Sequence, residues 1–290
     1  SDGPLHMENE IDSLLTEVDN SMSLYNPQSL LSRLNRNETD SVDGFIAECI
    51  RTARRISEHS DGAYDITVKP LTAAYGFTGD VPVQNPDVDS LLKLVGYDKI
   101  AVENGRLRKA DPRMQIDLNS IAQGATSDYI AAYFEKLGIE EYMIEVGGEI
   151  FCRGLNAKGK PWVVGIDRPK EGNFTPGADL QVKISLSGKG LATSGNYRKF
   201  RTDSSGRKIV HTVDPRTGQP VTSDLLSATV VAETSAEADA YGTALMVMGL
   251  ERGKEFLAAH PEIQAYLIYS DEQGRFQTYV TPELGRTIAR

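Results

Sequence analysis

The chain has 290 residues, of which 40% are apolar and 25% charged, as is usual for a globular protein that buries a sizeable core. Its 31 basic and 41 acidic residues give a net charge of -10, which argues against a protein whose main task is to bind a nucleic-acid backbone. Two cysteines, Cys49 and Cys152, exclude a disulfide-rich scaffold and a cysteine-rich metal site, although one bridge between them stays open. No apolar run approaches the roughly 18 residues of a membrane-spanning helix.

The first seven residues, which end in His6-Met7, resemble a remnant of an expression vector. An amphipathic segment begins directly after them, so we expect a single domain over residues 8–290. Two closely packed subdomains within that range are an alternative. If Met7 replaces a removed leader, the absence of a signal peptide says little about the compartment.

The N-terminal part of the chain is predicted to be mainly helical. Apolar residues recur every three or four positions over 8–25 and again over 44–59, where His59-Ser60-Asp61-Gly62 ends the pattern. Alternation over 64–68 predicts a strand, and the pattern over 86–95 predicts another short helix.

The rest of the chain is predicted to alternate between strands and helices. Residues 116–120 indicate a strand end that leads into a helix ending near Gly138, and two apolar runs around Gly147-Gly148 predict a hairpin. Further strands are predicted over 162–166, 180–186, 209–213, 228–232, 265–269 and 276–280, a second clear helix over 235–249, and a surface loop over 169–178. This order favours an α+β fold with a mostly antiparallel sheet core flanked by helices.

The start of the helix at residue 235 carries the first pattern that suggests chemistry. Thr234 and Glu237 fit a capping box, which fixes the helix start. Asp239 and Thr243 then lie four residues apart on one face, near a helix N-terminus that favours a carboxylate. A carboxylate and a hydroxyl are oxygen ligands of the kind that Mg²⁺ takes. The alternative is an acidic helix start with a packed threonine.

A second polar segment, Asp117-Leu118-Asn119-Ser120-Ile121-Ala122-Gln123-Gly124, opens the helix that ends near Gly138. Free N–H groups point outward at such an opening and can bind an anion. The alternative is that Ser120 merely caps the helix and Asp117 precedes it.

A third segment, from His211 to Gly218, places one histidine and one aspartate at a Pro/Gly turn after a strand. Histidine is the usual general base near neutral pH, but a lone histidine is more often structural. A fourth segment, from Leu191 to Arg198, by itself predicts only a loop.

Seven sets of residues along about 11–280 occur in a specific order: Met22-Ser23-Leu24-Tyr25 with Leu31-Ser32-Arg33-Leu34-Asn35; Ser60 to Leu71 with Tyr75-Gly76-Phe77; Asp117 to Gly124; Glu145-Val146-Gly147-Gly148-Glu149; Ala192 to Arg198; His211 to Gly218; and Ala238 to Thr243. Each set is weak alone. Together they resemble the ApbE family, the FAD:protein FMN transferases.

The resemblance implies an enzyme that binds FAD and Mg²⁺ and breaks the pyrophosphate. FMN is then attached through a phosphoester to a Thr or Ser hydroxyl of an acceptor flavoprotein, and AMP is released. Asp239 and Thr243 are implied as side-chain ligands of Mg²⁺, with a main-chain carbonyl near Ser120, and His211 as candidate base for the acceptor hydroxyl. The residues expected to line FAD are Met22, Ala63, Tyr64, Asp65, Asp117, Gln123, Val213 and Gly242, with Gly147, Gly148 and Glu149 beside it. Tyr64 either stacks on a ring of FAD or is a core tyrosine.

Two positions depart from the family pattern. The family usually has lysine where this chain has Gln123, and loss of that cation weakens phosphate binding or shifts it onto Mg²⁺. Lys69 stands where the family usually has glycine, and it would crowd the site if that glycine needs a positive φ or close ligand approach.

Two other functions stay open beside flavin transfer. Water in place of the acceptor hydroxyl would make a Mg²⁺-dependent FAD pyrophosphatase that yields FMN and AMP. A non-catalytic FAD-binding protein would only store or deliver the flavin. The expected partners are FAD and an acceptor flavoprotein, with no nucleic acid. Family members generally work outside the cytoplasmic membrane, so the resemblance implies the cell envelope, either periplasmic or lipoprotein-anchored.

Overall fold

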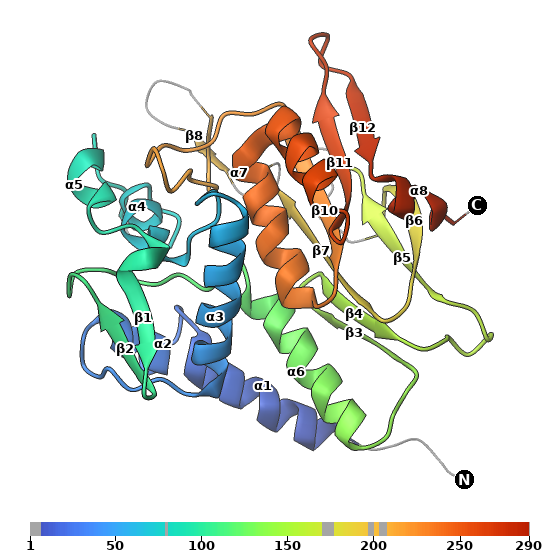
Figure 1. Ribbon diagram of the computed structural model, residues 1–290, viewed down its shortest axis with the longest axis horizontal. Coiled ribbons are helices and arrows are strands. Elements are labelled where there is room, and N and C mark those ends of the chain that lie inside the picture. Colours follow the sequence, from blue (N-terminus) through green and yellow to red (C-terminus); the bar gives the residue numbers. More distant parts are fainter. Residues whose placement is uncertain (1–6, 79–80, 170–176, 197–199, 203–207, 290) are drawn as a thin grey trace.

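The structure is a computed structural model that describes residues 7–78, 81–169, 177–196, 200–202 and 208–289 (Figure 1). Its centre is a six-stranded sheet in the order β12-β11-β10-β7-β4-β3, in which every neighbouring pair is antiparallel. The strands are β3 (Tyr142–Val146), β4 (Glu149–Arg153), β7 (Lys189–Gly195), β10 (Leu225–Ala232), β11 (Gln264–Ser270) and β12 (Phe276–Val280). The predicted fold class, α+β with a mostly antiparallel sheet core flanked by helices, is confirmed.

Three smaller antiparallel pairs are separate from this sheet in the described part of the chain. They are β1 (Ile100–Glu103) with β2 (Arg106–Lys109), β5 (Trp162–Asp167) with β6 (Leu180–Leu186), and β8 (Phe200–Thr202) with β9 (Lys208–Val210).

Helices α6 (Ala122–Lys136) and α7 (Ser235–Ala259) pack on one face of the sheet, and α1 (Glu8–Met22) and α3 (Gly44–His59) pack against them (Figure 1). The shorter helices are α2 (Leu30–Asn35), α4 (Lys69–Ala74), α5 (Val88–Leu92) and α8 (Pro282–Arg286), with 3-10 turns η1 (Ile66–Val68) and η2 (Tyr97–Lys99). None of the helices in the described ranges is both long and apolar enough to cross a membrane.

Two hydrophobic clusters lie on the two faces of the central sheet. Along β10, Val230 belongs to the larger cluster with α3, α6 and α7, whereas Val231 belongs to a second cluster with β5, β6 and α8. This alternation follows from the two-residue period of a strand that is buried on both faces. The two cysteines fall in different clusters, Cys49 in the first and Cys152 in the second, and both are free thiols.

Most predicted elements are confirmed. The helix over 44–59 is α3, and the helix predicted over 235–249 begins at Ser235 with both hydrogen bonds of the expected capping box. Its predicted end is the point where Gly249 (φ 75°) bends α7, which continues to Ala259. Gly147-Gly148 joins β3 to β4 as a hairpin. The strands over 162–166, 180–186, 228–232, 265–269 and 276–280 are β5, β6, β10, β11 and β12, and the helices over 8–25 and 86–95 are the shorter α1 and α5.

The strand predicted over 64–68 is wrong, because the segment forms η1 and runs into α4. The Asp65 carboxylate accepts hydrogen bonds from both the N–H and the hydroxyl of Thr67, each at 2.7 Å, and this cap starts a helical turn. Pro70 then occupies the first turn of α4, where its missing N–H costs nothing. The alternation of apolar residues here reflects burial around a turn.

Residues 116–118 belong to no strand, and Asn119 and Ser120 lie in a turn that leads into α6. The side chain of Asn35 takes the place of a neighbouring strand, because its amide group bonds both the N–H and the carbonyl of Ile116 at 2.8 Å. The strand predicted over 209–213 is also shorter than expected: β9 ends at Val210, and Val213 forms an isolated bridge with Pro220.

The segment predicted as a loop from Leu191 to Arg198 belongs to β7 as far as Gly195, and β7 lies between β4 and β10, while Tyr197 and Arg198 lie outside the described residues. Gly190, directly before this segment, is required by a close approach. A Cβ atom on Gly190 would lie 2.2 Å from the backbone N of Ser235, so only glycine lets the start of α7 pack on this strand. Most of the loop predicted over 169–178 lies outside the described residues.

Candidate active site

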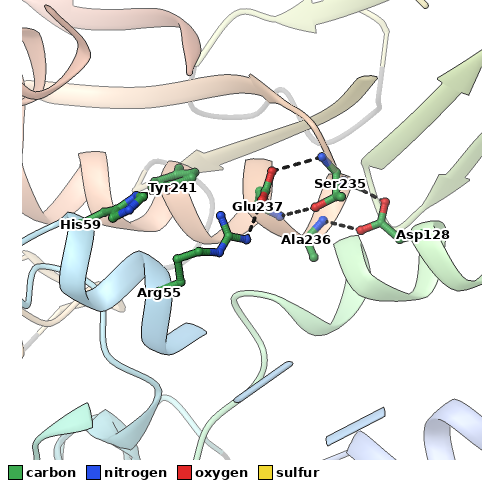
Figure 2. Close-up of polar contacts among 8 residues, drawn as sticks. Arg55, His59, Asp128, Ser235, Ala236, Glu237 and Tyr241 are labelled. Atoms are coloured by element: carbon green, nitrogen blue, oxygen red, sulfur yellow. Dashed lines mark hydrogen bonds and ion pairs between the residues drawn. The ribbon is translucent and has the colours of Figure 1, made fainter. Parts of the chain in front are cut away.

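The start of α7 satisfies each of its first backbone N–H groups inside the protein. The hydroxyl of Thr234 accepts from Glu237 N (3.2 Å), and the Glu237 carboxylate accepts from Thr234 N (3.3 Å). The N–H groups of Ser235 and Ala236 donate to the two carboxylate oxygens of Asp128 on α6, at 2.8 and 2.9 Å (Figure 2). This helix start is therefore a fixed platform with no free donor for an anion.

Asp239 lies on this platform, and its side chain is almost completely buried (6% exposed). Burial raises the pKa of its carboxyl well above the usual value, and the negative charge of Glu149 raises it further, while a hydrogen bond from Gly124 N–H opposes the shift. Its Oδ2 atom has no hydrogen-bond partner among the residues that the structure describes. A buried carboxylate with one open oxygen beside a second carboxylate is suited to a cation.

Thr243, the second predicted metal ligand, lies over β7. Its hydroxyl is 3.4 Å from the hydroxyl of Ser194, and a Cβ atom on Gly242 would lie 2.9 Å from that same Ser194 oxygen. Gly242 thus lets α7 approach β7 closely enough to bring the two hydroxyls together.

Ser120, the third predicted metal ligand, contacts Tyr64. The Tyr64 hydroxyl donates to the Ser120 carbonyl (3.4 Å) and accepts from the Ser120 hydroxyl (3.2 Å). Burial raises the pKa of Tyr64 well above its usual value, and the negative charge of Asp239 adds to this shift. The Tyr64 ring is 1% exposed within the larger cluster, which favours the core-tyrosine interpretation over stacking on a ligand.

The hairpin between β3 and β4 lies against the start of α6. A Cβ atom on Gly147 (φ 68°) would lie 1.7 Å from Nε2 of Gln123 and 3.4 Å from Oε2 of Glu149. The hydroxyl of Ser127 donates to the Glu149 carbonyl at 3.0 Å. Gln123, Gly147, Gly148 and Glu149, predicted from separate segments, thus form one surface beside Asp239, and Gly147 and Gly148 are exposed there.

Four other residues predicted to line FAD make structural contacts. Met22 is buried, with its sulfur 3.5 Å from that of Cys49, and Ala63 is completely buried. Asp65 caps η1, and burial raises the pKa of its carboxyl. Asp117 accepts from Asn119 N at 2.9 Å. Their contact with FAD stays a prediction.

The segment that carries His211 lies beyond the end of β7. The hydroxyl of Thr212 donates to Oδ1 of Asn196 at 2.7 Å, and Asn196 directly follows β7. The His211 ring is edge-on to Phe77, with 6.4 Å between ring centroids, and Val213 packs in a small cluster with Leu71. Thr212, between His211 and Val213, therefore ties this segment to the end of β7 that carries Ser194. The roles of His211 and Val213 stay predictions.

Lys69 is not in a strained conformation. Its backbone is right-handed helical (φ -51°, ψ -40°), so this position does not need the conformational freedom of glycine. Its Nζ atom lies 3.4 Å from Oε1 of Gln115. The first condition for crowding, a positive φ, is therefore not met, and crowding through close ligand approach stays a prediction.

The described residues contain no cluster of three or more His, Cys, Asp or Glu side chains that could hold a metal ion. The predicted donor set fits this finding, because it consists of one carboxylate, one hydroxyl and one main-chain carbonyl. Mg²⁺ accepts such sparse protein coordination and fills its remaining positions with water and phosphate oxygens.

Sequence reasoning missed Asp128 and Arg55. Arg55 of α3 pairs with Glu237 at 2.6 Å, and its neighbour on the next turn, His59, bonds the Tyr241 hydroxyl at 2.9 Å (Figure 2). Neither residue belongs to a local motif, since each has its partners in a distant part of the chain. Only the packing of α3 and α6 against α7 reveals them.

Known proteins resemble this chain along nearly its whole length. The model of the ApbE family matches residues 2–267. FAD:protein FMN transferase from Escherichia coli (strain K12) is 34% identical over 96% of this chain and 80% of its own length, and that from Haemophilus influenzae is 35% identical over 91% and 79%. The flavin transferase ApbE structure from Vibrio cholerae has a TM-score of 0.83, 32% identity, and coverage of 97% of this chain and 90% of its own. The apo flavinyl transferase ApbE structure from Pseudomonas stutzeri has a TM-score of 0.86, 30% identity, and coverage of 99% and 90%.

This chain and these relatives share one α+β fold. The fold and the relatives together define a class of protein, the flavin transferases. The chain belongs to the ApbE family. The enzyme class expected from the sequence, FAD:protein FMN transferase, is thereby confirmed.

Proposed function

We propose that this protein transfers FMN from FAD to a Thr or Ser hydroxyl of an acceptor flavoprotein through a phosphoester bond, with Mg²⁺ bound and with release of AMP. The observation that carries the proposal is the buried carboxylate of Asp239, whose Oδ2 atom has no hydrogen-bond partner among the described residues, one turn before Thr243 on α7. The names of the relatives supply FAD, FMN and a protein acceptor.

Asp239 and Thr243 would hold Mg²⁺ through their side chains, and Ser120 would hold it through its carbonyl. Bound Mg²⁺ would neutralise charge on the pyrophosphate oxygens and so ease the departure of AMP. The Gly124 N–H holds the Asp239 carboxylate, and the neighbouring Gln123 amide provides a neutral donor where phosphate is expected.

His211 would accept the proton of the acceptor hydroxyl. The hydroxyl oxygen then forms a bond to the phosphorus of the FMN half. The bond from that phosphorus to the bridging oxygen breaks, and AMP leaves with that oxygen. The role of the protein is to hold nucleophile and leaving group in line. The FAD-lining residues expected from the sequence would bind the flavin and adenine parts.

The proposal is tested with the purified protein, FAD and Mg²⁺, with and without an acceptor domain. AMP is followed by chromatography and the acceptor by mass spectrometry. Transfer requires AMP matched by an FMN-sized mass gain, and no gain on an acceptor whose target hydroxyl residue is changed to Ala. AMP without a mass gain would instead identify an FAD pyrophosphatase, and FAD binding without AMP a flavin-binding protein. Chelation with EDTA should stop the reaction, and added Mg²⁺ should restore it.

We further propose that the protein works in the cell envelope outside the cytoplasmic membrane, as a periplasmic or lipoprotein-anchored enzyme. The support for this location is the resemblance to the ApbE family, whose members generally work outside the cytoplasmic membrane. Fractionation of cells that express the natural gene tests it, because recovery only in the cytoplasmic fraction would contradict it.

A further inference from the structure

Asp128 joins the two helices that carry the candidate metal site. It lies on α6, and its two carboxylate oxygens accept from the N–H groups of Ser235 and Ala236, the first two helical residues of α7 (Figure 2). Ser235 is completely buried and Ala236 is 8% exposed, so water cannot replace these bonds. The start of α7 therefore depends on a carboxylate from another element.

Helix α7 likewise supplies a carboxylate that accepts from the backbone of α6. The N–H of Gly124 at the start of α6 donates to the carboxylate of Asp239 on α7. A Cβ atom on Gly124 would lie 2.4 Å from the Ser235 carbonyl oxygen, so the two helix starts are in direct backbone contact. Each helix thus supplies one aspartate that accepts from the backbone of the other.

We propose that Asp128 is a positioning residue for the metal site: by holding the first turn of α7 against α6, it places the Asp239 carboxylate with one oxygen open for Mg²⁺. Asp239 lies one turn beyond Ala236, so any shift or fraying of this helix start moves its side chain. The proposal rests on the assignment of Asp239 to Mg²⁺ made above.

A neutral side chain at position 128 cannot accept from both the Ser235 and the Ala236 N–H group. Asparagine has one carbonyl oxygen, and its NH₂ group would face the second backbone N–H, so one of the two donors would lose its partner. Burial raises the pKa of the Asp128 carboxyl to about 6, and the negative charge of Glu237 also raises this pKa. Arg55 pairs with Glu237 and so offsets part of that repulsion.

The test compares Asp128→Asn and Asp128→Ala with the wild type by titrating the FAD-free protein with Mg²⁺ in a calorimeter. Changes behind a metal ligand typically weaken metal binding about 10- to 100-fold, and we expect a loss in that range, larger for Ala than for Asn. The matched control is Asp43→Asn, which removes a capping carboxylate from α3 at the end away from His59, and its Kd for Mg²⁺ should change less than about twofold.

Kinetics separate positioning from general destabilisation. The Mg²⁺ concentration for half-maximal AMP release should rise in Asp128→Asn, while the rate at saturating Mg²⁺ should recover most of the wild-type value. A wild-type Kd for Mg²⁺ in both Asp128 variants would overturn the proposal. So would an equal rise in the Asp43→Asn control.

Hydrogen exchange covers the case in which the variants fail to fold. In the wild type, the amides of Ser235 and Ala236 should exchange far more slowly than those of an unstructured peptide, and exchange at the peptide rate would overturn the proposal. If wild-type protein with protected amides binds no Mg²⁺ and releases no AMP, the proposed function fails, whereas Asp128 variants that match an active wild type would refute only the positioning role.

Discussion

Asp239 illustrates at the scale of one residue how a functional group can oppose stability. Its carboxylate is buried, lies near Glu149, and leaves Oδ2 without a hydrogen-bond partner among the described residues. Such a group destabilises the metal-free fold, because desolvation of a charge is not compensated by a partner. A bound cation would remove that penalty.

We therefore expect Asp239→Asn to stabilise the metal-free protein while it abolishes turnover. The neutral amide avoids the desolvation of a charge, and a gain on the order of 1–2 kcal/mol would raise Tm by a few degrees. Mg²⁺ should raise the Tm of the wild type but not of the variant. The measurements are thermal unfolding with and without Mg²⁺ and AMP release. Retained turnover would remove Asp239 from the metal site.

His211 is expected to act on the acceptor and not on FAD. His211→Ala should bind FAD with the wild-type Kd and transfer FMN about 100-fold or more slowly, as is typical for loss of a general base. The comparison is made by fluorescence titration of FAD and by acceptor mass over time. His260→Ala is the matched control, since His260 pairs with Glu262 at the far end of α7 and its loss should leave the rate unchanged. An unaltered rate in His211→Ala would exclude His211 as the base.

At the scale of elements, the contact between β7, α6 and α7 depends on backbone atoms that touch. The backbone of Ser235 lies between Gly190 of β7 and Gly124 of α6, and a Cβ atom on either glycine would approach it within 2.4 Å. Backbone atoms of a capped helix start cannot move aside as a flexible side chain can. The position of α7, and with it that of Asp239, is thus fixed by two glycines.

Gly190→Ala should therefore destabilise the protein by about 2 kcal/mol or more, because the added methyl group forces α7 away from the sheet. Gly44→Ala is the control: Gly44 begins α3, and a methyl group added there would meet no atom within 4 Å. That change should alter stability by less than about 1 kcal/mol. Urea unfolding measures both variants, and equal effects would show that the contact at Gly190 does not matter.

At the scale of the whole molecule, buried carboxylates set part of the pH dependence of stability. Burial raises the pKa of Asp128 to about 6 and also raises that of Asp65. Asp128 faces Glu237 and Thr234 as well as Asp239. A carboxyl whose pKa is higher in the folded than in the unfolded state binds a proton on folding between the two pKa values, so its contribution to stability falls as the pH rises through that window.

The free energy of unfolding of the metal-free protein should consequently decrease as the pH rises from about 4 to about 6. Asp128 alone accounts for a contribution on the order of 3 kcal/mol over the window from its usual pKa to about 6. Chemical unfolding at a series of pH values measures the slope, which should flatten in Asp128→Asn. A free energy whose slope over this interval is the same in the wild type and in Asp128→Asn would contradict the assignment.

Most local elements and the family could be predicted from the sequence alone, whereas the roles of the candidate site residues stay predictions. The capping box at Thr234 and Glu237, the Gly147-Gly148 hairpin and the period of α3 depend on neighbours within a few residues, so their patterns are visible in the chain. The ordered motifs likewise indicated the ApbE family, which the comparisons confirm.

The packing of the elements, in contrast, could not be predicted from local patterns. The segment from Leu191 to Arg198 suggested a loop, but as far as Gly195 it lies in the central strand β7, and the 64–68 segment forms a turn because Asp65 caps it from within a buried environment. Asp128 could not be found at all, since its two donors lie 107 and 108 residues away. Close approach and burial are properties of pairs of elements, and a linear pattern carries no distance between them.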